Sequence, residues 1–140
     1  MKNIAKQIKR IIFATILVTV VIACKEDDIN EIFVEREWKL TLIKDGGEMK
    51  YTQDKVYTIQ FFDNTFKATL PNGGAINGNW KANGSTREFS CSNVRTSGSF
   101  AGDTIAQKMV QILTNAKKYS GDTNWLQIKQ QENVYMQFYN

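Results

Sequence analysis

The chain has 140 residues, with 18 Lys and Arg against 14 Asp and Glu, no histidine and a formal net charge of +4. The four charged residues among the first 23 are all basic, so residues 24–140 keep 14 basic side chains (18 less 4) against 14 acidic ones. This balance argues against a nucleic-acid partner, which needs a basic footprint. The lack of histidine removes histidine-based catalytic triads and most transition-metal sites.

The N-terminal segment has the layout of a bacterial lipoprotein signal. Its basic residues come first, at Lys2, Lys6, Lys9 and Arg10. An apolar run at residues 11–23 follows, and these 13 residues fit a signal peptide but are too few for a transmembrane helix, which needs roughly 20. Val21-Ile22-Ala23-Cys24 resembles a lipobox, so we expect residues 1–23 to be a lipoprotein signal peptide and Cys24 to carry the lipid.

The membrane is therefore the first expected partner, through the lipid anchor on Cys24. Two or more acyl chains hold a protein on a bilayer, whereas one chain binds reversibly. The charged run Lys25-Glu26-Asp27-Asp28 fits a solvated spacer, and it also resembles a surface-export signal of one group of Gram-negative lipoproteins. We expect residues 24–33 to form an acidic flexible tether and the protein to be lipid-anchored in the outer membrane, facing either the periplasm or the cell surface.

Alternation of apolar and polar residues predicts a single β-rich domain over residues 34–140. Trp38, Leu40 and Leu42 share one face of its first strand, which a turn at Asp45-Gly46-Gly47 ends. Further strands are expected at residues 55–62, 65–70, 76–82 and 87–92, with turns at Asp63-Asn64, Pro71-Asn72-Gly73-Gly74 and Asn83-Gly84. These five strands form an antiparallel meander, and residues 94–102 are expected to be a loop.

Apolar residues recur at every second position up to this point and then at about every 3.6 residues, which predicts one amphipathic helix over residues 103–119. Asp103 is its expected N-cap, and Ser120-Gly121 ends it. A last hairpin carries Leu126 and Ile128 opposite Val134, Met136 and Phe138, with a turn at residues 131–133. The predicted fold is α+β: a curved antiparallel β-sheet of about seven strands, a meander plus a C-terminal hairpin, packed on one α-helix.

The order of these features resembles the META domain, the family of the heat-shock protein HslJ. The resemblance covers about residues 33–140 and is carried by the features Trp38-Lys39-Leu40, Tyr57-Thr58-Ile59-Gln60-Phe61, Gly78-Asn79-Trp80, the helix and the Leu126-x-Ile128 hairpin. It implies a small envelope-associated domain with no established catalytic activity. Two family features are absent: a Cys-Asn pair where this chain has Ala75-Ile76-Asn77, and a Met-Ala-Cys segment before the helix.

Few residues suggest chemistry. The acidic residues sit mostly at turns, where turn and cap hydrogen bonds explain them, and no cofactor, metal or enzymatic activity is expected. With Cys24 lipidated, Cys91 has no intramolecular disulfide partner and is expected to be a buried free thiol. Trp125, Tyr135 and Tyr139, interleaved with Gln and Lys, could form a flat sugar- or peptide-binding face. Ordinary cross-strand packing, covered by the helix or the rest of the sheet, is the favoured interpretation of these aromatics.

The sequence thus predicts a lipid-anchored, non-catalytic lipoprotein of the outer membrane or cell surface that contacts another envelope component, either a protein or a glycan. The alternative is a lipocalin-like module that carries a small apolar ligand in its interior.

Overall fold

The computed structural model describes residues 29–34 and 36–140. The signal peptide expected at 1–23, the lipid-attachment residue Cys24 and the acidic run 25–28 lie outside the described residues. A π-helical turn, η1 (Asn30–Val34), comes first, and the one α-helix among the described residues is α2 (Thr104–Thr114). The strands are β1 (Glu37–Asp45), β2 (Glu48–Tyr51), β3 (Thr58–Phe61), β4 (Thr65–Thr69), β5 (Ala75–Asn83), β6 (Glu88–Ser97), β7 (Lys118–Gly121), β8 (Trp125–Gln131) and β9 (Val134–Tyr139).

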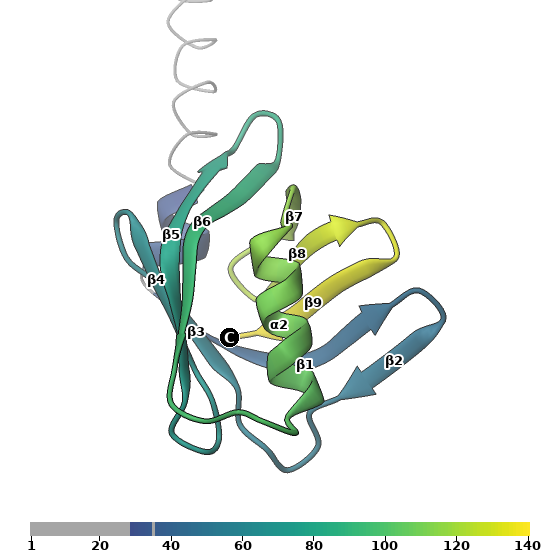
Figure 1. Cartoon of the computed structure of the whole chain (residues 1–140). Helices are drawn as coiled ribbons and strands as arrows, with labels where there is room; N and C mark the ends of the chain where they lie inside the picture. Colours follow the sequence, from purple (N-terminus) through teal and green to yellow (C-terminus); the bar gives the residue numbers. More distant parts are fainter. Residues whose placement is uncertain (1–28, 35) are drawn as a thin grey trace, which may run out of the picture.

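All strand pairs are antiparallel, and the strands lie in the order β2-β1-β3-β4-β5-β6-β7-β8-β9 (Figure 1). β1 also pairs with β9, so the sheet closes on itself into a ring. The weakest junction of the ring joins β6 to β7 through a single residue pair, Glu88 and Lys118. The helix α2 packs against β6, β8 and β9 and so covers the side of the ring where the strands diverge.

The interior of the ring is filled by aromatic side chains gathered around Phe33 of η1. Its ring centroid lies 4.9 Å from that of Trp80 and 5.0 Å from that of Tyr119, and the rings of Phe61 and Phe89 lie 5.1 and 5.6 Å away. Buried Trp38 holds η1 in place, because its Nε1 donates a hydrogen bond to the carbonyl oxygen of Ile32 at 3.0 Å. Residues 29–34 are thereby attached to the folded body, although 24–33 was expected to be a flexible tether.

A bulge in β1 corrects the predicted facing of the first strand. The register with β9 shifts between Leu40 and Leu42, which leaves Thr41 as the extra residue. Trp38 and Leu40 point into the core as predicted, but Ile43 is buried in place of Leu42, which turns outward.

The α+β class, the antiparallel sheet and its packing on one α-helix are confirmed for the described residues, whereas the number of strands is nine instead of about seven. The short strands β2 and β7 are additional, and β6 continues to Ser97, into the stretch predicted to be a loop. The helix ends at Thr114 instead of 119, because the side chains of Thr114 and Asn115 bond the carbonyl oxygens of Val110 and Gln111 at 2.7 and 2.9 Å. None of the helices in the described part of the chain is long and apolar enough to cross a membrane.

Candidate functional site

The outer surface of strands β2, β1, β9 and β8 carries the aromatic residues that the sequence singled out. Leu126 and Ile128 of β8 and Val134, Met136 and Phe138 of β9 are buried, so the residues that alternate with them face out. Cross-strand register places Trp125 beside Tyr139, Gln127 beside Gln137, and Lys129 beside Tyr135. We call the paired outward positions of these four strands the aromatic–amide face: Lys39, Leu42, Lys44, Met49, Tyr51, Trp125, Gln127, Lys129, Tyr135, Gln137 and Tyr139.

The face continues without a break across β1 and β2. On the β1 side, Tyr139 pairs with Lys39, Gln137 with Leu42, and Tyr135 with Lys44. In the next strand Tyr51 lies beside Leu42 and Met49 beside Lys44. The face therefore spans four strands, and the bulge that turns Leu42 outward is what allows the β1 residues to join it.

Amide hydrogen bonds order the centre of the face. Gln127 Nε2 donates to Gln137 Oε1 at 2.9 Å, and Gln137 Nε2 donates to the Tyr139 hydroxyl oxygen at 3.0 Å. The two amides stand between the Trp125–Tyr139 pair and the more distant Tyr135. Because these bonds use only part of the hydrogen-bonding capacity of the three side chains, the remaining donors and acceptors can serve a ligand.

The structure brings Trp125, Tyr135 and Tyr139 onto one outward surface and does not cover them with the helix. The buried residues of α2 belong to the same core cluster as the inward residues Ile128 and Phe138, so α2 packs on the opposite side of the sheet. Tyr139 is 47% exposed, and Trp125 and Tyr135 are half-buried. The register sets Trp125 opposite Tyr139 and Tyr135 opposite Lys129, and the helix that was expected to cover these aromatics lies on the other side of the sheet.

Sequence reasoning missed the β2 part of the face. Met49 and Tyr51 are 49% and 57% exposed, and they sit on a strand of four residues directly after a two-residue turn. The signal was an apolar–polar alternation over Glu48–Tyr51, too short to be distinguished from a loop.

A concave region, separate from the aromatic–amide face, lies where the ring is weakly joined. This groove has a volume of about 590 Å³ and is open to solvent. It runs between the β5–β6 hairpin and the segment after α2, and its lining residues are Lys81, Ala82, Asn83, Glu88, Phe89, Ser90, Ala116, Lys117 and Lys118. Its walls combine three lysines with one glutamate, and it follows directly from the single-pair junction of β6 with β7.

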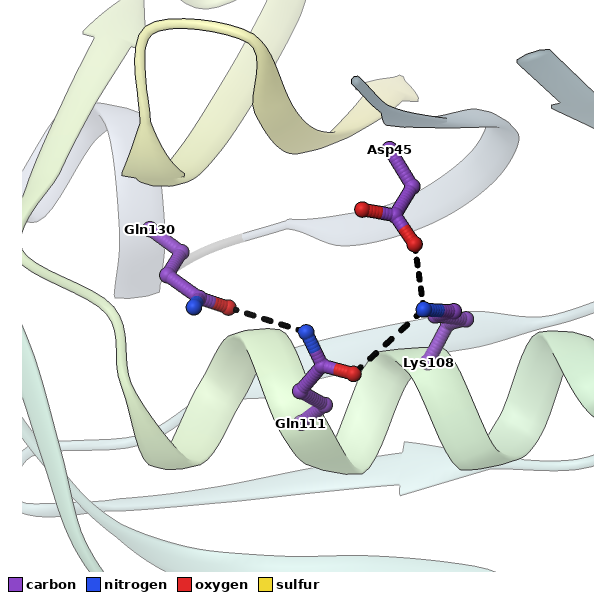
Figure 2. A network of polar contacts seen from close by, with 4 residues as sticks. All are labelled: Asp45, Lys108, Gln111 and Gln130. Carbon is purple, nitrogen blue, oxygen red and sulfur yellow. Dashed lines mark hydrogen bonds and ion pairs between the residues drawn. The ribbon is translucent and has the colours of Figure 1, made fainter. Parts of the chain in front are cut away.

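Figure 2 shows a polar network that fixes α2 against the sheet. Lys108 of α2 forms an ion pair with Asp45 at the end of β1 and donates to Gln111 Oε1 at 3.4 Å. Gln111 Nε2 in turn donates to Gln130 Oε1 of β8 at 3.3 Å. The polar groups of these four side chains bond one another, so the network is interpreted as a structural connection between β1, α2 and β8.

The N-terminus of α2 has a second connection. The Asp103 carboxylate accepts a hydrogen bond from the Ala106 amide at 3.0 Å and thereby caps the helix, as predicted. It also accepts from the hydroxyl of buried Tyr57, with oxygen distances of 2.7 and 2.9 Å. Burial of the phenol, and then this bond to Asp103, raise the pKa of Tyr57 above its ordinary value. The phenol stays protonated and acts as a donor.

The thiol at Cys91 is free and half-buried among core residues, which is less burial than the sequence predicted. Burial raises the pKa of Cys91 to about 12. The thiolate is the reactive form of cysteine, so Cys91 is a poor nucleophile at neutral pH.

The acidic residues of the described part of the chain do not gather into a cluster. Asp63 follows β3, Glu88 opens β6 and Asp103 caps α2. Within residues 29–34 and 36–140, no group of three or more His, Cys, Asp or Glu side chains could hold a metal ion.

Comparison with known proteins identifies related chains but no activity. The model of a domain of unknown function, DUF4847, matches residues 48–140. A crystal structure of a DUF4847 family protein from Bacteroides vulgatus ATCC 8482 is similar over 79% of this chain and 96% of that chain, with 21% sequence identity and a TM-score of 0.62. At this identity the likeness shows the fold alone. No curated protein matches the chain.

The predicted membership of the META family is wrong, because the matching family model and the matching structure are both DUF4847 and no META match is found. The physical reason is that the resemblance rested on the order of features. A Trp-bearing first strand, sequential hairpins and one helix are general features, and this chain, which the DUF4847 model matches, has them in the same order.

Proposed function

The chain belongs to the DUF4847 family, and from that premise we propose that it is a non-catalytic, lipid-anchored lipoprotein of the outer membrane that contacts another envelope component. The anchor is Cys24, and the contacting surface is the aromatic–amide face. The observation that carries the contact role is the distribution of exposed apolar residues. Of the five exposed large hydrophobic side chains among the described residues, Met49, Tyr51 and Tyr139 all stand on this one face.

The anchor is supported by the sequence before the described residues. Four basic residues, a 13-residue apolar run and Val21-Ile22-Ala23-Cys24 follow one another in the order that export and lipid transfer require. Each buried methylene contributes about 0.8 kcal/mol to membrane binding, so a multiply acylated Cys24 would hold the protein on a bilayer without further contacts.

Contact through a surface is better supported than a ligand held in the interior. The ring is filled by the aromatic cluster around Phe33, and Trp38, Phe61 and Met136 are also fully buried there. A lipocalin-type site would need a cavity of roughly 300 Å³ or more to enclose a small molecule. The groove beside β6, of about 590 Å³, is open to solvent and reaches the aromatic cluster only at Phe89.

The anchor is tested by replacing Cys24 with Ala in the full-length chain expressed in a Gram-negative host. The native chain should incorporate a fatty-acid label and partition into the detergent phase, whereas Cys24→Ala should do neither. Cys91→Ala is the matched control, because it removes the other thiol and should leave labelling unchanged. Labelling of Cys24→Ala, or detergent partition of that variant equal to the native chain, would contradict the anchor.

A further inference from the structure

We propose that the aromatic–amide face binds an acidic polysaccharide, a glycan chain that carries carboxylates. This inference rests on the proposed contact role of the face and names the chemical class of its partner.

The aromatic side chains supply surfaces on which sugar rings can stack. Trp125 and Tyr139 are directly opposite on neighbouring strands, where Cβ atoms lie about 5 Å apart. Tyr135 is two pairs further along β9, about 14 Å away at ~3.4 Å per residue. Flat rings held at fixed separation along a sheet suit an extended chain of several sugar units better than a single small molecule.

Amide and hydroxyl groups lie between the stacking positions. Gln127, Gln137 and the Tyr139 hydroxyl are linked by hydrogen bonds of 2.9 and 3.0 Å, which orients them before any ligand arrives. Sugar hydroxyls both donate and accept, and these three side chains offer both kinds of group. Preorganised polar groups lose little side-chain entropy on binding.

The charge on the face selects an anionic chain. Among the eleven residues of the aromatic–amide face, Lys39, Lys44 and Lys129 are basic and none is acidic. Three carboxylates border the face. That of Glu132 lies 3.5 Å from the Lys129 Nζ, but its side chain is 84% exposed and such a pair contributes little. Glu37 lies two residues before Lys39 on the same side of β1, and the Asp122 carboxylate accepts a hydrogen bond from the Trp125 amide. Residues 24–140 have balanced charge overall, so this excess is a property of the face.

Over β8 and β9, which carry the rings and amides of the face, a polysaccharide fits better than an acidic peptide because the backbone is already in use. Of the four strands of the face, β2 alone has a free edge, and it is four residues long. β9 pairs with both β1 and β8, and β8 pairs with both β7 and β9. An extended peptide bound to a sheet gains affinity by adding a strand to a free edge, and these central strands offer none. Recognition here depends on side chains alone, namely rings, amides and ammonium groups.

The test measures binding of the purified lipidated chain, in detergent, to three immobilised polymers: polygalacturonate, dextran and polyglutamate. They represent an acidic glycan, a neutral glycan and an acidic peptide. Binding should be strongest to polygalacturonate, by about tenfold or more over each of the others. Trp125→Ala and Lys44→Gln should each weaken it by about tenfold, and Trp125→Phe should restore most of the loss. Tyr139→Ala, at an exposed position, gives the same test with little risk to folding.

Matched controls come from elsewhere on the surface. Phe62→Ala removes an aromatic ring that is 50% exposed, and Lys67→Gln removes an exposed charge on β4; neither should change binding. Equal binding to polyglutamate, equal binding to dextran, no binding to polygalacturonate, or an unchanged Trp125→Ala variant that keeps its fold would each overturn the proposal. The unlipidated Cys24→Ala chain should bind polygalacturonate as the native chain does, so failure of the anchor and failure of glycan binding are separate results.

Discussion

The hydroxyl of Tyr57 donates to the same Asp103 carboxylate that caps α2, at 2.7 Å. Tyr57 precedes β3, so this bond joins the start of the helix to the far side of the ring. The helix is thus attached at its N-terminus, through Tyr57 and Asp103, and along its length, through Lys108, Gln111 and their partners.

Replacing Tyr57 with Phe should destabilise the protein by about 1–3 kcal/mol, since it leaves a part-buried carboxylate with the Ala106 amide but without the phenol donor. Urea unfolding followed by circular dichroism measures the change. Asp103→Ala removes the helix cap as well and should lose about 0.5–2 kcal/mol more, whereas Asp103→Asn keeps an oxygen that can accept from Ala106 and Tyr57 and should lose less than Asp103→Ala. A Tyr57→Phe variant as stable as the native chain would show that the carboxylate finds another donor.

Stability should decrease at alkaline pH, and Cys91 should be one cause. Burial raises the pKa of Cys91 from 9.0 to about 12 in the folded state. Its contribution is fully present below the pKa of the unfolded chain. As pH rises past about 9, the unfolded chain loses the thiol proton while the folded chain keeps it, so the free energy of unfolding falls until about pH 12.

The free energy of unfolding is measured at pH 8, 9 and 10 for the native chain and for Cys91→Ala. Only the difference between the two chains in the slope of this free energy against pH is attributed to the thiol. Parallel slopes would contradict a buried, protonated Cys91. The pKa of Tyr57 is also raised in the folded state, so Tyr57 likewise lowers the free energy of unfolding above about pH 10. Measuring Tyr57→Phe in the same way gives the part of the decrease that comes from Tyr57.

Phe33 should be among the most sensitive positions of the core, although it lies before the first strand. Its ring is fully buried and contacts four other aromatic rings, so Phe33→Ala should cost about 3–5 kcal/mol. Phe62→Ala, at an exposed ring, should stay within about 0.5 kcal/mol of the native chain. If thermal unfolding shows Phe33→Ala to match Phe62→Ala, η1 is not part of the cooperative core.

Regular alternation predicted the central hairpins well, and interruptions of that alternation explain most errors. The Asn83-Gly84 turn between β5 and β6 is where the sequence placed it. Beyond it, Asn93 has a φ of +52° and the register with β5 shifts, so β6 continues with its inward and outward positions exchanged. In the sequence, a strand with a bulge at its centre has the pattern of a strand followed by a loop. The bulge in β1 hid the facing of Leu42 and Ile43 for the same reason.

The candidate site was predicted in part, because its three aromatics lie on two strands joined by one recognisable hairpin. The β1 and β2 contributions could not be predicted, since they depend on which strand lies beside β9. That neighbour is β1, almost 100 residues away: Lys39 pairs with Tyr139. No local pattern in the sequence specifies such a pairing.

The pairing of Lys39 with Tyr139 also sets an order on folding. Hairpins such as β3–β4, β5–β6 and β8–β9 bring together residues close in sequence and can form early. The contact between β1 and β9 closes a loop of about a hundred residues, which is slow to form because of its entropic cost. Half of the aromatic–amide face therefore exists only after this last contact, and a partly folded chain cannot present it.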